Sequence, residues 1–135
     1  MDIERISNKD ELLAIIVYGS FQSDGIHFFS EDKDSQQVAF IKHPSGKVIQ
    51  PHIHNSVKRV IYNTTEVLIL RKGKLRVNFF TVGYEFLMSR LLQEDDLIIL
   101  LKGGHGFEVI EDVEIIEVKQ GPYLGDRDKI RFDTR

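Results

Sequence analysis

Residues 66 to 77, EVLILRKGKLRV, indicate the fold more directly than any other stretch of this chain. Two apolar runs flank Lys72-Gly73-Lys74, a turn signal, so the stretch predicts a strand, a turn and a second strand. Similar runs fill most of the sequence, and we expect strands over residues 25–29, 36–42, 47–54, 59–63, 66–72, 74–82, 85–92, 96–101, 107–110 and 113–119. Many short strands at close spacing predict an all-β fold, an antiparallel sandwich or barrel.

The N-terminal residues predict one short helix beside these strands. Ser7 or Asn8 can cap a turn that contains Asp10 and Glu11, and apolar residues follow. The next residues, IIVYGSF, are β-branched and aromatic and lead to Gly19, so the helix would be short.

Composition excludes several classes of protein. The chain has 135 residues, of which 41% are hydrophobic and 29% charged, as expected of one soluble domain spanning residues 1–135. Its net charge is -3 and its basic residues are scattered, so we expect no nucleic-acid partner. The apolar runs fall far short of the roughly 20 residues of a membrane helix. The charged N-terminus lacks the apolar core of a signal peptide, which predicts a cytoplasmic protein.

Two histidines mark the predicted strand over residues 47–54. Residues two apart in a strand point to the same face, so His52 and His54 would project together, with Cα atoms roughly 6.7 Å apart. Two such imidazoles can converge on one metal ion. The alternative is that both are half-exposed strand residues without a ligand. The chain has no cysteine, so any metal must be held by histidine and carboxylate.

The spacing around these histidines adds a second signal. Gly46, five residues, His52, one residue and His54 match G(X)5HXH, and Glu66, six residues and Gly73 match E(X)6G. These are the two ends of the first cupin motif, and the sequence resembles the cupin superfamily over roughly residues 35 to 119. The resemblance implies a single cupin domain, a small β-barrel of two packed antiparallel sheets with a metal site in its mouth.

The chain departs from the cupin pattern in both motifs. Eleven residues separate His54 from Glu66, where cupins usually have three or four. Either an enlarged loop precedes Glu66, which the spacing to Gly73 favours, or Glu66 is not a ligand. The second motif, within QEDDLIILLKGGHGFEVI at residues 93–110, lacks its usual proline and asparagine but retains His105.

The resemblance therefore implies a site of three histidines and one glutamate, formed by His52, His54, Glu66 and His105. Such ligands suit Fe, Mn, Ni, Zn or Cu, and the residues do not choose among these metals. Alternatively, Glu66 is a strand-end carboxylate that pairs with a neighbouring basic residue in solvent.

Three further residues are candidates for binding a small polar ligand. Arg59 can clamp a carboxylate or phosphate with two hydrogen bonds, and Tyr62 can stack on a ligand, bind it or act as a general base. Gln50 shares a predicted strand face with the two histidines, and Gln50 or Tyr62 could replace Glu66 as a ligand. The alternative for Arg59 and Tyr62 is a solvated hairpin without a function.

Three functions are compatible with these residues. The first is a metal-dependent isomerase or epimerase acting on a small polar substrate such as a sugar. The second is an Fe(II) dioxygenase with the same ligands, and the third is a non-catalytic binding or sensor module. Because small cupins commonly associate in pairs, we also expect a homodimer, for which residues 25–29, GIHFF, could supply an exchanged strand.

Overall fold

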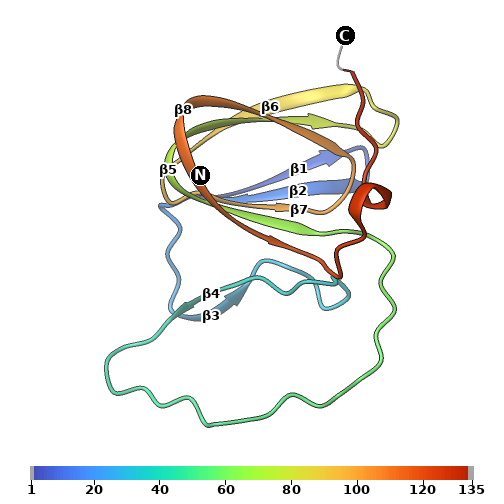
Figure 1. The fold of residues 1–135 in the computed structure, drawn as a ribbon. Coiled ribbons are helices and arrows are strands. Elements are labelled where there is room, and N and C mark those ends of the chain that lie inside the picture. The colour runs from blue at the N-terminus through green and yellow to red at the C-terminus, as the bar shows by residue number, and fades with distance from the viewer. Residues whose placement is uncertain (1, 134–135) are drawn as a thin grey trace. The chain divides into compact units, whose positions relative to one another are not determined.

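The computed structural model describes residues 2–133, and its regular structure is almost entirely antiparallel β-sheet (Figure 1). The expectation of an all-β protein is confirmed. The elements are β1 (Ile3–Asn8), β2 (Glu11–Val17), β3 (Gly25–Phe28), β4 (Ala39–Lys42), β5 (Glu66–Phe80), β6 (Phe86–Gln93), β7 (Leu97–Leu100), β8 (Gly104–Lys119) and one turn of 3-10 helix, η1 (Gly125–Asp128). Among residues 2–133, no helix has the length and apolar character needed to cross a bilayer.

The chain divides into two compact units. The larger combines the described parts of Met1–Phe21 and Asn63–Arg135, and it contains a six-stranded sheet. The smaller, Gln22–Tyr62, contains the two-stranded sheet of β3 and β4. Ile26 of β3 pairs with Ile41 of β4 in that small antiparallel sheet.

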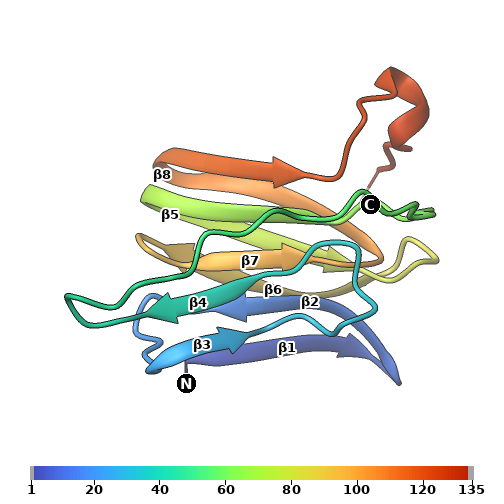
Figure 2. The same ribbon diagram turned by 90° about the horizontal axis from the view of Figure 1, so that it is seen from below.

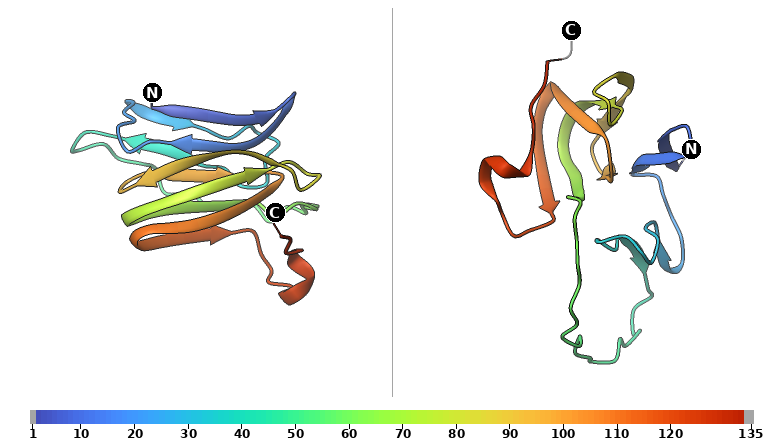
Figure 3. Two further views of the ribbon diagram at one scale, coloured as in Figure 1. Left: turned by 90° about the horizontal axis from the view of Figure 1, so that it is seen from above. Right: turned by 90° about the vertical axis from the view of Figure 1, so that its right-hand side faces the viewer.

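The six-stranded sheet has the order β1-β2-β7-β5-β6, with β8 paired to β5 as well. The first half of β5 pairs with β7 and the second half with β6, while β8 follows β5 along most of its length. The sheet curls strongly into an open half-barrel (Figures 2 and 3). Its core is formed by residues of all six strands except β8, namely Ile6, Ala14, Ile16, Leu68, Leu70, Leu75, Val77, Phe79, Leu92, Ile98 and Leu100.

Gly73 makes the bend on which this curl depends. Before it, the core residues of β5 are even-numbered, and after it they are odd-numbered: Leu68 and Leu70, then Leu75, Val77 and Phe79. In a regular strand such a change would turn one half of the side chains outward. The pairing of β5 with β8 shifts register between Leu70 and Leu75, and Gly73 adopts a φ of 90° there. The irregularity keeps both apolar halves of β5 on the inner face.

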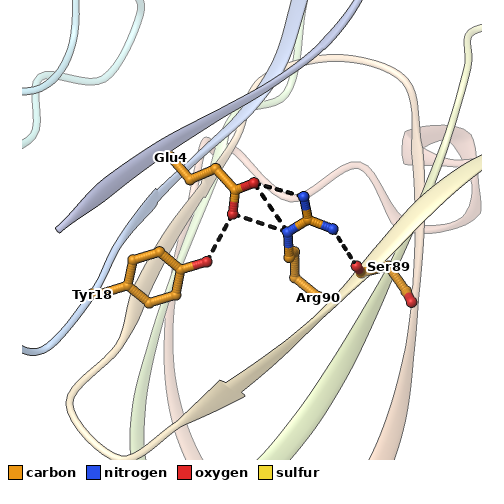
Figure 4. A network of polar contacts seen from close by, with 4 residues as sticks. All are labelled: Glu4, Tyr18, Ser89 and Arg90. Carbon is orange, nitrogen blue, oxygen red and sulfur yellow. Dashed lines mark hydrogen bonds and ion pairs between the residues drawn. The ribbon is translucent and has the colours of Figure 1, made fainter. Parts of the chain in front are cut away.

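A network of side chains joins β1 to β6, the outer strands of this path (Figure 4). Arg90 donates to both carboxylate oxygens of Glu4, at 2.9 Å from Nε to Oε1 and 2.7 Å from Nη2 to Oε2. The Tyr18 hydroxyl donates to the same carboxylate at 2.8 Å. The hydrogen bonds from Arg90 lower the pKa of Glu4, whereas burial, aided by Glu4, raises the pKa of Tyr18 to about 12. The curl therefore brings the two outer strands within side-chain reach of each other.

The predicted N-terminal helix is wrong. Its residues form the hairpin of β1 and β2, with Lys9 at the turn in a positive-φ conformation. The run from Leu13 to Val17 is buried at every position, and four residues of β2 pair with β7. A neighbouring strand satisfies the backbone of this β-branched run better than an isolated helical turn would.

Other boundaries also differ from the predicted ones. Residues 43–65, all within the described part of the chain, form no strand, so the strands expected over residues 47–54 and 59–63 are not present. Pro44 and Pro51 lack the amide hydrogens that a central strand donates. Conversely, the strands expected over 107–110 and 113–119 form one continuous strand, β8. The strand expected over residues 96–101 forms at Leu97–Leu100, and it is buried on both faces at Ile98 and Ile99.

Candidate functional site

The pairing of β5 with β7 and the short connection from β7 to β8 bring Glu66 and His105 together. Glu66 lies on the same face of β5 as Leu68 and Leu70, because side chains alternate along a strand. His105 is directly opposite the core residue Phe79, so it too lies on the inner face. Glu66 Oε1 and His105 Nε2 are 3.6 Å apart, and the side chains are 19% and 26% exposed. Two polar groups therefore meet at the margin of an apolar core.

Glu117 is a third member of this group that the sequence did not reveal. It is opposite Leu68 across the pairing of β5 with β8, on the same face as Glu66. The contact with His105 lowers the pKa of Glu66, against the effect of burial, and a hydrogen bond with Glu117 lowers it further. That hydrogen bond raises the pKa of Glu117. Of the two carboxyl groups, Glu66 is therefore the one that ionises more readily.

The alternation of residues 113–119 does place Glu117 and Lys119 on one face of a strand. It does not say which strand lies alongside or in what register. Only the pairing of Glu66 with Lys119 brings the two glutamates close together. Glu117 can therefore be identified as a neighbour of Glu66 from the strand pairing, but not from the sequence alone.

His52 and His54 form a second pair, within the smaller unit. Their ring centroids are 5.2 Å apart and the rings meet edge to face, so the expected proximity is present without a strand. His52 Nδ1 is 2.9 Å from the carbonyl oxygen of Gln50. Because a carbonyl only accepts hydrogen bonds, Nδ1 carries a proton in this contact, and in the neutral ring Nε2 presents its lone pair.

The remaining candidates for ligand binding also belong to this irregular stretch. Gln50 contributes its backbone carbonyl to His52, and its side chain is exposed. Arg59 is exposed, and Tyr62 is 92% exposed. The predicted hairpin that would have carried Arg59 and Tyr62 is not formed, so their roles in ligand binding remain predictions.

A surface hollow beside Tyr18 has a structural explanation. It is lined by Tyr18, Gly19, Ser20 and residues 93–96. The buried carboxylate of Asp96 accepts hydrogen bonds from the backbone amides of Gly19 at 2.9 Å and Gln93 at 2.8 Å. Asp96 therefore fastens the start of β7 to the end of β2, and both of its oxygens have protein partners.

The four predicted metal ligands thus form two pairs, Glu66 with His105 and His52 with His54. Within residues 2–133, no three or more His, Cys, Asp or Glu side chains are grouped closely enough to hold a metal ion. The four-ligand site remains a prediction. Comparison with known proteins finds no matching family model, no matching curated protein and no matching solved structure.

Proposed function

We propose that this protein is a cupin-type β-barrel that binds one divalent metal ion through His52, His54, Glu66 and His105. We further propose that it acts on a small polar substrate such as a sugar or sugar derivative, as an isomerase or epimerase. The observation that carries the proposal is the contact between Glu66 and His105, at 3.6 Å on the inner face of the curled sheet. An imidazole nitrogen and a carboxylate oxygen in that position are suitable ligands for Fe, Mn, Ni, Zn or Cu.

Two local features support this choice of ligands. Gly73 lies at the bend of β5, where a positive φ is required, so the spacing from Glu66 to Gly73 has a physical basis. The hydrogen bond from His52 Nδ1 to the Gln50 carbonyl leaves Nε2 free. Histidines that bind metals are commonly oriented through the other ring nitrogen in this way.

Several residues would have separate roles in the proposed reaction. A divalent ion would act as a Lewis acid on adjacent substrate oxygens and lower the pKa of a bound hydroxyl or water. Glu117 would hold the Glu66 carboxylate in place through their hydrogen bond. Arg59 would pair with an anionic group of the substrate and Gln50 would hydrogen-bond to it. Tyr62 would act as the general base.

A non-catalytic binding module is the second candidate. The Glu66 carboxylate already has partners in His105 and Glu117, so this pair is satisfied by protein groups alone. A pocket of that kind could bind a polar ligand without turning it over. The Fe(II) dioxygenase would use the same four ligands, and it would be identified by iron in the protein and by oxygen consumption.

A titration with Co2+ tests the proposed site, since bound Co2+ has visible absorption that reports nitrogen and oxygen ligands. We expect a saturable spectrum from the wild-type protein and a large loss of affinity in His105→Ala. His43→Ala is the matched control, because His43 lies outside the proposed ligand set and should titrate like wild type. Equal titrations for all three proteins would contradict the assignment of His105.

We also propose that the protein is a homodimer in the cytoplasm. The short strand β3 has two large exposed apolar residues, Ile26 and Phe28, which a second copy would cover. Light scattering that gives the mass of a monomer at micromolar concentration would exclude this arrangement.

A further inference from the structure

The C-terminal segment Gln120–Asp133 runs from the last residue of β8 back to the region where β8 begins. It leaves β8 after Lys119 and returns to the end of the sheet where β8 begins (Figures 1 and 2). At its start, the Gln120 amide donates to the Thr65 carbonyl at 3.0 Å, one residue before Glu66. At its end, the Phe132 ring lies against Gly104, one residue before His105. Each end of the segment is therefore fixed next to one member of the Glu66–His105 pair.

Phe132 is held by a cluster of aromatic rings. It stacks on Tyr84, with centroids 4.8 Å apart, and meets Phe80 edge to face at 5.3 Å. A Cβ atom at Gly104 would lie 2.7 Å from Cζ of Phe132, so the absence of a side chain there makes room for the ring. Contacts of this kind add to the free energy of burying the ring. Phe132 thus anchors the C-terminal end of the segment to the sheet, and we call this anchor the clip.

The middle of the segment is much less constrained than its two ends. Ile130 is 75% exposed, and the helical turn η1 contains no buried residue. Tyr123 is close to Lys119, whose ammonium group is 5.6 Å from the centroid of the ring. Residues 121–131 could span roughly 36 Å if fully extended. The ends of the segment lie next to Glu66 and His105, whose side chains are in contact, so the segment is longer than the distance between its ends. Release of Phe132 would therefore free the segment without breaking the sheet.

We propose that Gln120–Asp133 is a strap that covers the Glu66–His105 pair on the side of β8. The strap opens when Phe132 leaves its aromatic cluster. The closed strap limits access to this pair from the β8 side. Its role as a gate for metal or substrate rests on the proposed function. Its attachment through Phe132 does not, so the two can be tested separately.

Limited trypsin digestion of the full chain measures the opening of the strap, because cleavage sites follow Arg127, Lys129 and Arg131. We expect Phe132→Ala and Gly104→Ala to be cut in the strap about tenfold faster than wild type, a change equivalent to about 1.4 kcal/mol. Ile130→Ala, which alters an exposed side chain of the same segment, should be cut at the wild-type rate. Cleavage after Lys58, in the irregular stretch, provides an internal reference in the same digest.

Stopped-flow uptake of Co2+ then tests the gate. The two clip variants should take up Co2+ several-fold faster than wild type and Ile130→Ala. Unchanged strap cleavage in both clip variants would overturn the strap itself. Faster cleavage with unchanged Co2+ uptake would overturn its role in access. If the wild-type protein takes up no Co2+, the proposed function fails and the gate fails with it, while the cleavage rates still decide whether Phe132 clips the segment.

Discussion

Replacing Gly73 with alanine should remove much of the stability of the curled sheet. Gly73 has a φ of 90°, and a Cβ atom there would lie 2.0 Å from the carbonyl oxygen of Asp112, where ordinary contacts are 3.4–4 Å. Left-handed backbone costs an L-residue about 1–2 kcal/mol. Moving β5 and β8 apart to admit the methyl group should cost a further ~1–3 kcal/mol, as for overpacked cores. We therefore expect Gly73→Ala to lower the free energy of unfolding by about 2–5 kcal/mol.

Gly46→Ala is the matched control for this experiment. Gly46 has a nearly identical φ of 93°, but a Cβ there would have no atom within 4 Å. Its cost should not exceed the backbone term of about 1–2 kcal/mol. Urea unfolding followed by far-ultraviolet circular dichroism gives both values. If Gly73→Ala destabilises the protein no more than Gly46→Ala, Gly73 is not the bend on which the sheet depends.

Three further predictions concern the network that joins β1 to β6. Arg90→Met should lower the free energy of unfolding, measured by urea unfolding, by about 1.5–3 kcal/mol. The reason is that it leaves the Glu4 carboxylate, which is 16% exposed, without its charged partner. The double variant Arg90→Met with Glu4→Gln should recover part of this loss. Since the pKa of Glu4 is lowered in the folded protein, its contribution is present above the usual value of 4.5 and is lost as the pH falls. The stability difference between wild type and Arg90→Met should therefore shrink below about pH 4.5 in acid unfolding. The pKa of Tyr18 is raised to about 12, so the stability it adds is present below the ordinary value of 10.0 and is lost as the pH rises through 12. In a spectrophotometric titration, Tyr18→Phe should remove a phenol that ionises near 12.

The sequence predicts the sheet best where apolar alternation is strong. The two halves of β5 are apparent from their letters, as is the buried strand β7. The turn predicted at Lys72-Gly73-Lys74 is wrong, because Gly73 forms a bend within one continuous strand. The N-terminal hairpin was missed because a serine or asparagine before acidic residues suits a helix cap as well as a turn. Its strand pairing is decided by β7, which lies 80 to 86 residues away in the chain.

The candidate site could be predicted in its residue types but not in its grouping. Histidine and glutamate at cupin spacing point to Glu66 and His105. These two meet because Glu66 pairs with Leu100 at the end of β7, and β8 begins with Gly104 just before His105. Glu117 needed the register of β5 with β8, which a single sequence does not specify. The segment around His52 and His54 has strand-like letters, but two prolines and the lack of a paired strand leave it irregular.

Elemental analysis of the purified protein tests the central claim most directly, run beside His54→Ala and Glu66→Ala. One variant is taken from each pair of proposed ligands, and circular dichroism confirms that both are folded. We predict near-stoichiometric metal in the wild-type protein, lost in His54→Ala and reduced in Glu66→Ala. The element found would then direct the choice between isomerase and oxygenase assays. No metal in any sample, and none taken up on reconstitution with divalent ions, would contradict the proposed metal centre.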